Sequence, residues 1–258
     1  MPVHLSLDGP VATLTLDEPG RKNAMTPELG DALQARVKEL QALADVRVVL
    51  LTGAGGAFSG GGDLAMLERL RQVPPDEAKR FMLDFYARYL SVLDLEVPTI
   101  AVVEGAAIGA GLCVALACDF CFVDRDAKLA LNFVQLGLHP GMGATYLVPR
   151  RVGAQVAARL LMTGERFDGA EAVRVGLAAE GHPRGELMPA ARAFATTLAA
   201  QAPMALRALK QELGVDRAAL HRCLEAEAAH QAVSYGSADM AEGLAAAAAR
   251  RPAKFTGR

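Results

Sequence analysis

The feature that most constrains the fold is a unit that occurs twice: an apolar strand, a glycine-rich loop and the start of a helix. The first copy runs from Val46 to Asp63 and the second from Thr99 to Ala117. Short strands interleaved with helices in this way predict α/β layering within one core. Alternating stretches at 4–7 and 11–16, together with the strand-like residues 120–123, extend the same core.

The remaining segments read mainly as helices. Thr26-Pro27 supplies an N-cap and a first-position proline, and an amphipathic helix is expected over 76–93. Strand signals stop at about Gly153, after which a capping-box pattern begins at Asp168 and further helices continue into the alanine-rich end of the chain. We therefore predict an α/β core over residues 1–195 and a C-terminal helical region over residues 196–258.

Composition excludes several classes of function. The chain has 258 residues, 52% of them hydrophobic, and a formal net charge of -2, which gives no basic surface for nucleic acid. No apolar run reaches the roughly 20 residues of a membrane span, and the first residues lack a signal-like pattern, so a cytoplasmic protein is expected. The four cysteines, Cys118 and Cys121 of a C-x-x-C pair included, have no spacing typical of a disulfide framework or metal site. No metal site is expected.

The glycine loops predict a site for negatively charged oxygen rather than for a nucleotide. Neither Gly-Lys-Ser/Thr nor a clean G-x-G-x-x-G with a later acidic residue follows the first loop, 53–62. Glycine allows a ligand to approach the main chain, and free N–H groups at a helix start attract negative charge. One such loop alone is also compatible with a tight turn that binds nothing. Two that converge on one oxygen make an oxyanion hole.

Five segments together resemble the crotonase superfamily, that is, the enoyl-CoA hydratases and isomerases. They correspond to its N-A-L/M, A-F-x-A-G-x-D-L, V-x-G-x-x-x-G-x-G…C-D, G-x-x-P-G-x-G-x-T and D-x-x-E-G…F-x-G-R motifs. In this sequence they are 21–25, 57–64, 103–119, 137–145 and 239–258. The resemblance implies an α/β, crotonase-like repeated β-β-α spiral core with a C-terminal helical region.

The same resemblance implies where an acyl thioester binds. Gly62 and Ala110 supply the two oxyanion N–H groups, and the substrate is an acyl-CoA or acyl-carrier thioester whose coenzyme A is part of the substrate rather than a separate cofactor. Family members form homotrimers, often paired into hexamers, in which the C-terminal residues contact coenzyme A of a neighbouring subunit. The residues expected at the coenzyme A and substrate site are Lys22, Ala24, Phe58, Gly60, Asp63, Leu64, Lys254 and Phe255.

The sequence departs from the hydratase pattern at both catalytic glutamates. Their positions are occupied by Cys113 and Phe133. Phenylalanine transfers no proton, and a thiol in an apolar helix stays protonated. Hydration of an enoyl thioester therefore lacks both usual acid/base groups, each typically worth about 10²–10⁴ in rate.

Three other residues are candidates for proton transfer. His230 lies on a C-terminal helix where decarboxylating members of the superfamily that act in polyketide β-branching carry a histidine, and those members also resemble this chain at Asn132-Phe133 and at 141–145. His139 and Tyr146 are the other two. Cations that would face a leaving carboxylate are available at Arg69, Arg71, Lys79 and Arg80, without a secure alignment for any of them.

Three functions remain open on the sequence. The first is an enzyme of the enoyl-CoA hydratase/isomerase type that stabilises a thioester enolate. The second is a decarboxylase of a 3-methylglutaconyl-type thioester held on coenzyme A or a carrier protein, because loss of CO₂ generates the enolate without a base. The third is an acyl-CoA-binding protein that performs no reaction.

Overall fold

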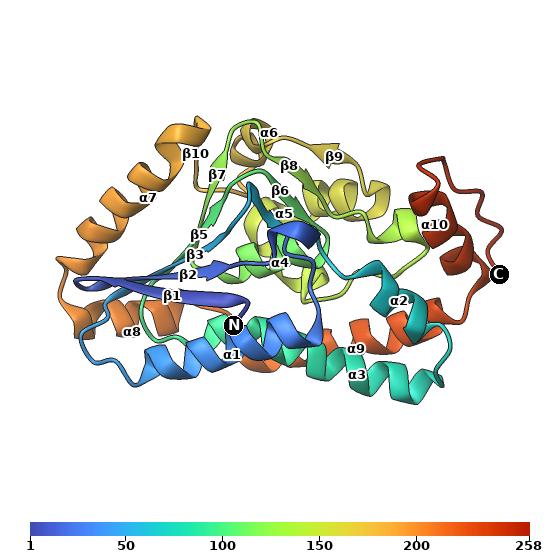
Figure 1. The fold of residues 1–258 in the computed structure, drawn as a ribbon, viewed down its shortest axis with the longest axis horizontal. Helices are drawn as coiled ribbons and strands as arrows, with labels where there is room; N and C mark the ends of the chain where they lie inside the picture. The colour runs from blue at the N-terminus through green and yellow to red at the C-terminus, as the bar shows by residue number, and fades with distance from the viewer.

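Two β-sheets form the centre of the molecule, which the computed structural model describes over residues 1–258 (Figure 1). The larger sheet has six strands in the order β1-β2-β3-β5-β7-β10, with β1 antiparallel to β2 and the rest parallel. The smaller has the order β4-β6-β8-β9, with only the last pair antiparallel. The strands are β1 (Val3–Asp8), β2 (Val11–Leu16), β3 (Val48–Gly53), β4 (Ala57–Ser59), β5 (Thr99–Val103), β6 (Ala106–Ile108), β7 (Phe120–Asp124), β8 (Lys128–Ala130), β9 (Arg166–Phe167) and β10 (Glu180–His182).

A repeated pair of strands explains why there are two sheets. In three successive segments the first strand (β3, β5, β7) joins the larger sheet and the second (β4, β6, β8) joins the smaller. A helix follows each pair, so the chain forms a spiral of repeated β-β-α units. The helices are α1 (Pro27–Gln41), α2 (Leu64–Leu70), α3 (Pro75–Leu90), α4 (Ala110–Ala117), α5 (Ala144–Thr163), α6 (Gly169–Arg174), α7 (Arg184–Ala199), α8 (Pro203–Leu213), α9 (Arg217–Tyr235) and α10 (Ala238–Ala248), with 3₁₀ turns η1 (Pro19–Arg21), η2 (Ser91–Asp94) and η3 (Phe133–Leu136).

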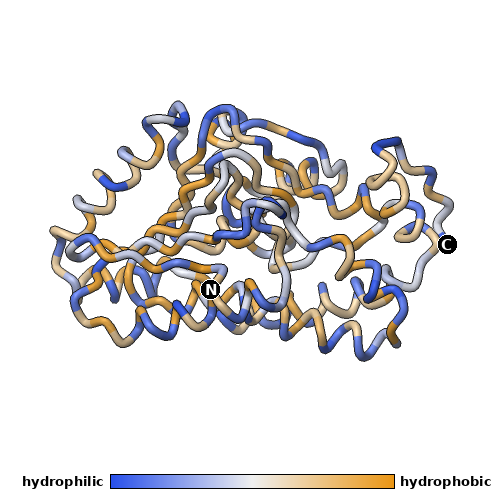
Figure 2. Tube along the Cα trace, in the orientation of Figure 1, coloured by the Kyte–Doolittle hydropathy of each residue, from blue (hydrophilic) through white to orange (hydrophobic).

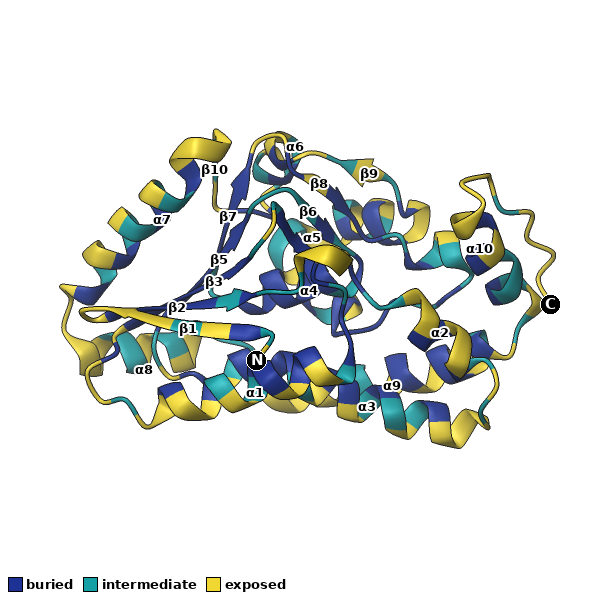
Figure 3. Ribbon diagram, in the orientation of Figure 1, coloured by how far each residue is buried: buried dark blue, intermediate teal, exposed yellow.

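Successive side chains of a strand point to opposite faces of the larger sheet, so the buried residues form one cluster on each face. On β3, Val49 and Leu51 belong to the main core, whereas Val48 and Leu50 pack against α7 on the opposite face. Both faces of the sheet are covered at β3, so this central strand is buried along its whole length, whereas the edge strand β1 is largely exposed (Figures 2 and 3). Helices α1, α3 and α9 lie along one side of the sheets, and α10 lies near α2 (Figure 1).

Most predicted elements are confirmed. The Thr26 hydroxyl caps α1 and the Asp168 carboxylate caps α6, each accepting from an N–H three residues on. The prediction that strands end near Gly153 is wrong, because β9 and β10 follow. Both are two- or three-residue strands fixed by pairing with distant partners, and β10 contains glycine, glutamate and histidine, which give no strand signal. The predicted boundary after residue 195 falls inside α7.

No helix of the chain combines the length and the apolar character that crossing a membrane requires.

Candidate functional site

The two glycine loops lie against each other because the strands that precede them are paired. β4 and β6 run parallel, and a Cβ added to Gly61 would come within 2.5 Å of the Ile108 carbonyl oxygen. A Cβ on Gly111 would lie 2.6 Å from that of Ser59. Gly61 and Gly109 also have φ values of 86° and 53°, which side-chain-bearing residues rarely adopt. The glycines are therefore required for the close approach of the loops.

Each loop has a free N–H beside the cavity, that of Gly62 in the first loop and that of Ala110 in the second. Neither the N–H of Gly62 nor that of Ala110 donates to another group of the chain. Ala110 is the first residue of α4, where N–H groups have no partner within the helix, and the N-cap Gly109 has no side chain to accept from them. Both residues line the same cavity. Free backbone N–H groups beside a cavity are the kind of donor that stabilises developing negative charge on oxygen.

The cavity is small and uncharged. It has a volume of about 240 Å³, and no Asp, Glu, Lys, Arg or His side chain lines it. Helices α2, α3, α9 and α10 contribute to its wall together with both glycine loops, η3 and the loop that precedes α5. The lining residues are Gly60, Gly61, Gly62, Leu64, Met66, Leu67, Met82, Phe85, Tyr86, Ile108, Gly109, Ala110, Asn132, Phe133, Leu136, Leu138, Gly141, Met142, Gln231, Tyr235 and Ala247.

A hydrogen-bonded cluster on α3 and α9 supplies most of the polar lining. The Tyr86 hydroxyl donates to the Gln231 side-chain oxygen at 2.8 Å, and the Gln231 amide donates to the His139 carbonyl at 2.8 Å. The Tyr235 hydroxyl lies 3.2 Å from the Met82 sulfur. Burial raises the pKa of Tyr86 well above 10, so its phenol stays protonated and serves as a donor rather than a base.

Sequence reasoning missed this cluster. Apolar residues at helical spacing on α3 and α9 indicate that one face of each helix is buried. The spacing is the same whether that face packs in the core or lines a cavity, so the sequence does not distinguish the two.

Cys113 and Phe133, which are expected at the positions of the usual glutamates, have different surroundings in the structure. Phe133 lines the cavity, whereas Cys113 is fully buried and does not. Burial raises the pKa of the Cys113 thiol well above its ordinary value, and the nearby Glu227 carboxylate raises it further. All four cysteines are free thiols. Neither position offers a base to a bound acyl group.

None of the three predicted proton-transfer residues lines the cavity. The His139 and His230 rings lie 4.7 Å apart, and His230 is exposed. The His139 Nδ1 is 2.7 Å from the Pro140 carbonyl, and burial lowers the pKa of His139. The Tyr146 hydroxyl accepts from the Asp216 N–H at 3.2 Å. This placement gives none of them direct access to a substrate carbon in the cavity.

The cations expected near a leaving carboxylate also lie outside the cavity. Arg71 pairs with Glu68 at 2.6 Å and Lys79 with Glu225 at 2.7 Å.

The structure groups several of the residues expected around coenzyme A. The Gly60 N–H donates to the Lys22 carbonyl at 2.8 Å, which holds 22–24 beside the first glycine loop. Leu64 lines the cavity and is 48% exposed, so it lies at the mouth. The Asp63 carboxylate caps α2 and pairs with Arg21 at 2.6 Å.

The other expected contacts are placed differently. Phe58 is completely buried in the main core and does not line the cavity. Lys254 and Phe255 are exposed near α10, where the Lys254 N–H donates to Glu242.

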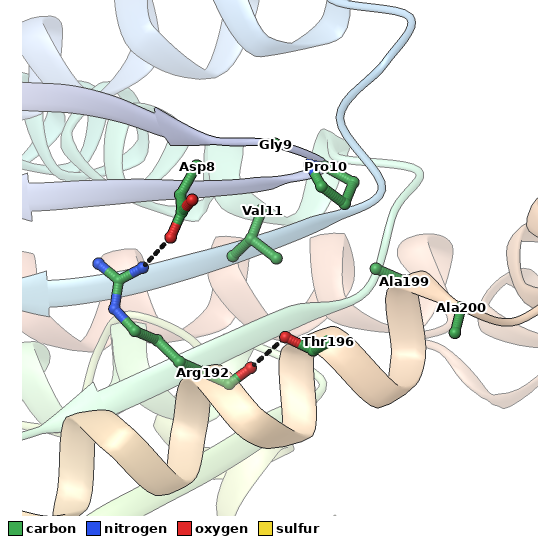
Figure 4. A pocket seen from close by; sticks show the side chains of 8 residues that line it. All are labelled: Asp8, Gly9, Pro10, Val11, Arg192, Thr196, Ala199 and Ala200. Atoms are coloured by element: carbon green, nitrogen blue, oxygen red, sulfur yellow. Dashed lines mark hydrogen bonds and ion pairs between the residues drawn. The ribbon is translucent and has the colours of Figure 1, made fainter.

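In two other hollows, charged side chains pair with each other. The one between the β1–β2 turn and α7, shown in Figure 4, contains Asp8 and Arg192, which pair with each other at 3.2 Å. A larger one of about 780 Å³ lies under α8, and its Lys210 pairs with Asp119 at 2.8 Å. The cavity at the glycine loops is therefore the candidate site.

Comparison with known proteins agrees with this geometry. Residues 7–258 match the model of the family described as enoyl-CoA hydratase/isomerase. The chain belongs to this family. A probable enoyl-CoA hydratase of Mycobacterium tuberculosis is 40% identical over 253 residues, covering 95% of this chain and 97% of that protein.

Solved structures of the family share the fold. An enoyl-CoA hydratase from Mycobacterium avium subsp. paratuberculosis has a TM-score of 0.86 and 27% identity, with 99% of each chain covered. A protein from a dehydratase/decarboxylase enzyme couple involved in polyketide β-branching has a TM-score of 0.85 and 27% identity over 95% of this chain and 98% of that one. Within the family, then, the fold is associated with more than one reaction.

Proposed function

We propose that the protein binds an acyl thioester, either acyl-CoA or an acyl-carrier thioester, and stabilises its enolate. The carbonyl oxygen accepts from the N–H groups of Gly62 and Ala110. The observation that carries this proposal is that both N–H groups are free and line one uncharged cavity. In such surroundings a fixed donor interacts more strongly with developing charge than it does in water.

Decarboxylation is the second candidate, and the absence of any carboxylate or imidazole from the cavity lining favours it. In an unsaturated thioester that carries a terminal carboxylate, the C–CO₂ bond breaks and its electron pair extends into the conjugated system. The negative charge then rests on the thioester oxygen as a dienolate. No base is required, and a proton from solvent completes the product.

The oxyanion assignment is tested by Ala110→Pro. Proline at the first position of a helix is well tolerated because the N–H that it removes has no helical partner. We expect the folded protein to retain its unfolding midpoint and to lose about 10²–10³ in turnover, which is typical of one oxyanion donor.

Ala110→Gly is the matched control, because it removes the side chain and keeps the N–H. Its turnover should stay near that of the parent. If Ala110→Pro folds and keeps full turnover, the Ala110 N–H does not stabilise the oxyanion.

The reaction itself is tested by mass spectrometry of acyl thioesters incubated with the purified protein. Gain of one water by crotonyl-CoA supports hydration, and loss of CO₂ from 3-methylglutaconyl-CoA supports decarboxylation. The same acyl groups on pantetheine or on a carrier protein separate the two kinds of thioester. Binding of the thioesters without turnover of any of them would favour a binding protein.

A further inference from the structure

The hollow of about 780 Å³ under α8 is separate from the cavity at the glycine loops and shares no lining residue with it. Helix α10 contributes to the cavity and α8 to the hollow, and these two helices lie at opposite ends of the molecule (Figure 1). The volume of the hollow is within the range of small-molecule sites, about 300–1,000 Å³. A ligand here would bind independently of a thioester at the glycine loops.

Helix α8 is not seated on the core. None of its residues is buried, although Leu206, Leu209 and Leu213 recur at helical spacing and line the hollow. Leu209 and Leu213 remain exposed. The core side of the hollow contains the buried Leu95 and Leu116. An aliphatic chain between these two walls would remove the leucines of α8 from water.

One arginine of the hollow keeps most of its hydrogen-bonding capacity. The Arg150 guanidinium donates to the Gly214 carbonyl at 3.2 Å and lies over the Tyr146 ring, and it makes no ion pair with a carboxylate. The Asp216 carboxylate, close by in the chain, instead caps α9 by accepting from the Ala219 N–H. Guanidinium groups donate in pairs to carboxylates. Arg150 can therefore hold the head group of an anion.

The other cations of the lining already have partners. Lys210 and Arg217 each pair with an aspartate of the lining, at 2.8 and 2.7 Å. Arg151 donates to three carbonyls at the end of α4 and just after it. Glu96, on the loop that follows η2, is exposed. In total four cations line the hollow against three carboxylates, so its charge favours an anionic ligand.

We propose that the hollow under α8 is a second binding site, which takes an aliphatic carboxylate. The chain of the ligand lies between the leucines of α8 and the core, and its carboxylate accepts from Arg150. Each methylene group that moves from water into the hollow strengthens binding about fourfold. A charge-assisted hydrogen bond to the carboxylate adds about tenfold over a neutral head group.

Calorimetry of the intact protein with octanoate, hexanoate and octanol tests the site. Octanoate should bind about fifteenfold more tightly than hexanoate, whose chain is two methylene groups shorter, and about tenfold more tightly than octanol, which carries no charge. Arg150→Gln should abolish the preference for octanoate over octanol while still binding octanol. Arg159→Gln is the matched control on the same helix, because Arg159 pairs with Glu165 and Glu171 outside the hollow.

Leu206→Glu places a charge between α8 and the core. It should abolish octanoate binding and leave the unfolding midpoint unchanged, because Leu206 is not buried. Met204→Glu is the matched control, since Met204 is 86% exposed on the same helix and does not line the hollow; it should bind octanoate like the parent.

Three results would overturn the inference: a parent that binds no octanoate, octanoate binding that survives in Leu206→Glu, or a preference over octanol that survives in Arg150→Gln. Sedimentation of the same variants identifies the other occupant of this hollow. If octanoate does not bind, and Leu206→Glu but not Met204→Glu lowers the mass of the particle, then a second copy of this chain covers α8.

Discussion

Gly141 is the residue at which the cavity wall leaves least room. A Cβ there would stand 2.4 Å from the Tyr86 hydroxyl oxygen and 2.5 Å from the Gln231 side-chain nitrogen. Gly141→Ala therefore forces the Tyr86 hydroxyl and the Gln231 carboxamide to move from these positions. We expect a loss of about 1–3 kcal/mol in the free energy of unfolding, typical of overpacking, and weaker thioester binding. Urea denaturation and calorimetry measure the two effects.

Gly185→Ala provides the comparison. Gly185 lies in α7 with nothing within 4 Å of an added Cβ, so alanine there should stabilise the helix by about 0.5–1 kcal/mol. If Gly141→Ala behaved like Gly185→Ala in both measurements, the contacts around Gly141 would not matter.

Single residues of the site differ in how far sequence could predict them. Gly62 and Ala110 are assigned to the oxyanion hole by the family resemblance of the motifs that contain them, and this assignment stays a prediction. Tyr86 and Gln231 do not, because their neighbours in space come from helices far apart in the chain. His230 was favoured by resemblance, yet its neighbour Gln231 is the residue that lines the cavity. A displacement of one residue along a helix turns a side chain by about 100°.

At the scale of elements, Glu227 joins α9 to the start of α5. Its buried carboxylate accepts from the Gly143 N–H at 2.7 Å, from the Thr145 N–H at 2.8 Å and from the Thr145 hydroxyl at 2.7 Å. Glu227→Ala leaves the buried Gly143 N–H without an acceptor and removes the acceptor of the Thr145 N–H and hydroxyl. We expect a loss of about 2–3 kcal/mol in the free energy of unfolding, measured by urea denaturation.

Glu225→Ala is the control on the same helix. Its carboxylate is exposed and pairs with Lys79, so its loss should lower the free energy of unfolding much less than the loss of Glu227 does. If both substitutions lowered the free energy of unfolding equally, the hydrogen bonds from Glu227 to the start of α5 would contribute no more to stability than a surface ion pair. Glu227→Gln, which keeps one acceptor oxygen, should lie between them.

For the whole molecule, the layered α/β core was predictable because its strands are long enough to carry a hydrophobic pattern. β3 and β5 are buried along their full length and read as strands from sequence alone. The split into two sheets was not predictable in the same way. β4, β6 and β8 have three residues each, and only their register against one another defines them. The resemblance to a known family supplied that part.

The pH dependence of overall stability reflects charges spread across the surface. Six exposed carboxyls have lowered pKa values, and those of Glu171 and Glu242 fall to about 2 because arginines donate to them. A carboxyl whose pKa is lowered in the folded state takes up its proton at a higher pH in the unfolded chain than in the folded one. Falling pH therefore favours the unfolded chain. Their stabilisation is therefore complete above about pH 4.5 and is lost progressively toward pH 2.

Two buried groups modify this profile. Burial lowers the pKa of His139, so a smaller loss of stability begins as the pH falls through 6.5. Burial raises the pKa of Glu227, which has the opposite effect: above pH 4.5 the folded state binds the extra proton, so stability rises as the pH falls.

Thermal unfolding followed from pH 8 to pH 3 should thus show a slight decline in the unfolding midpoint near neutrality and a steep one below about pH 4.5. In Glu171→Gln the steep part should become shallower, because this substitution removes one of the most strongly shifted carboxyls. A midpoint that stays constant between pH 5 and pH 3 would contradict the role assigned to these surface pairs.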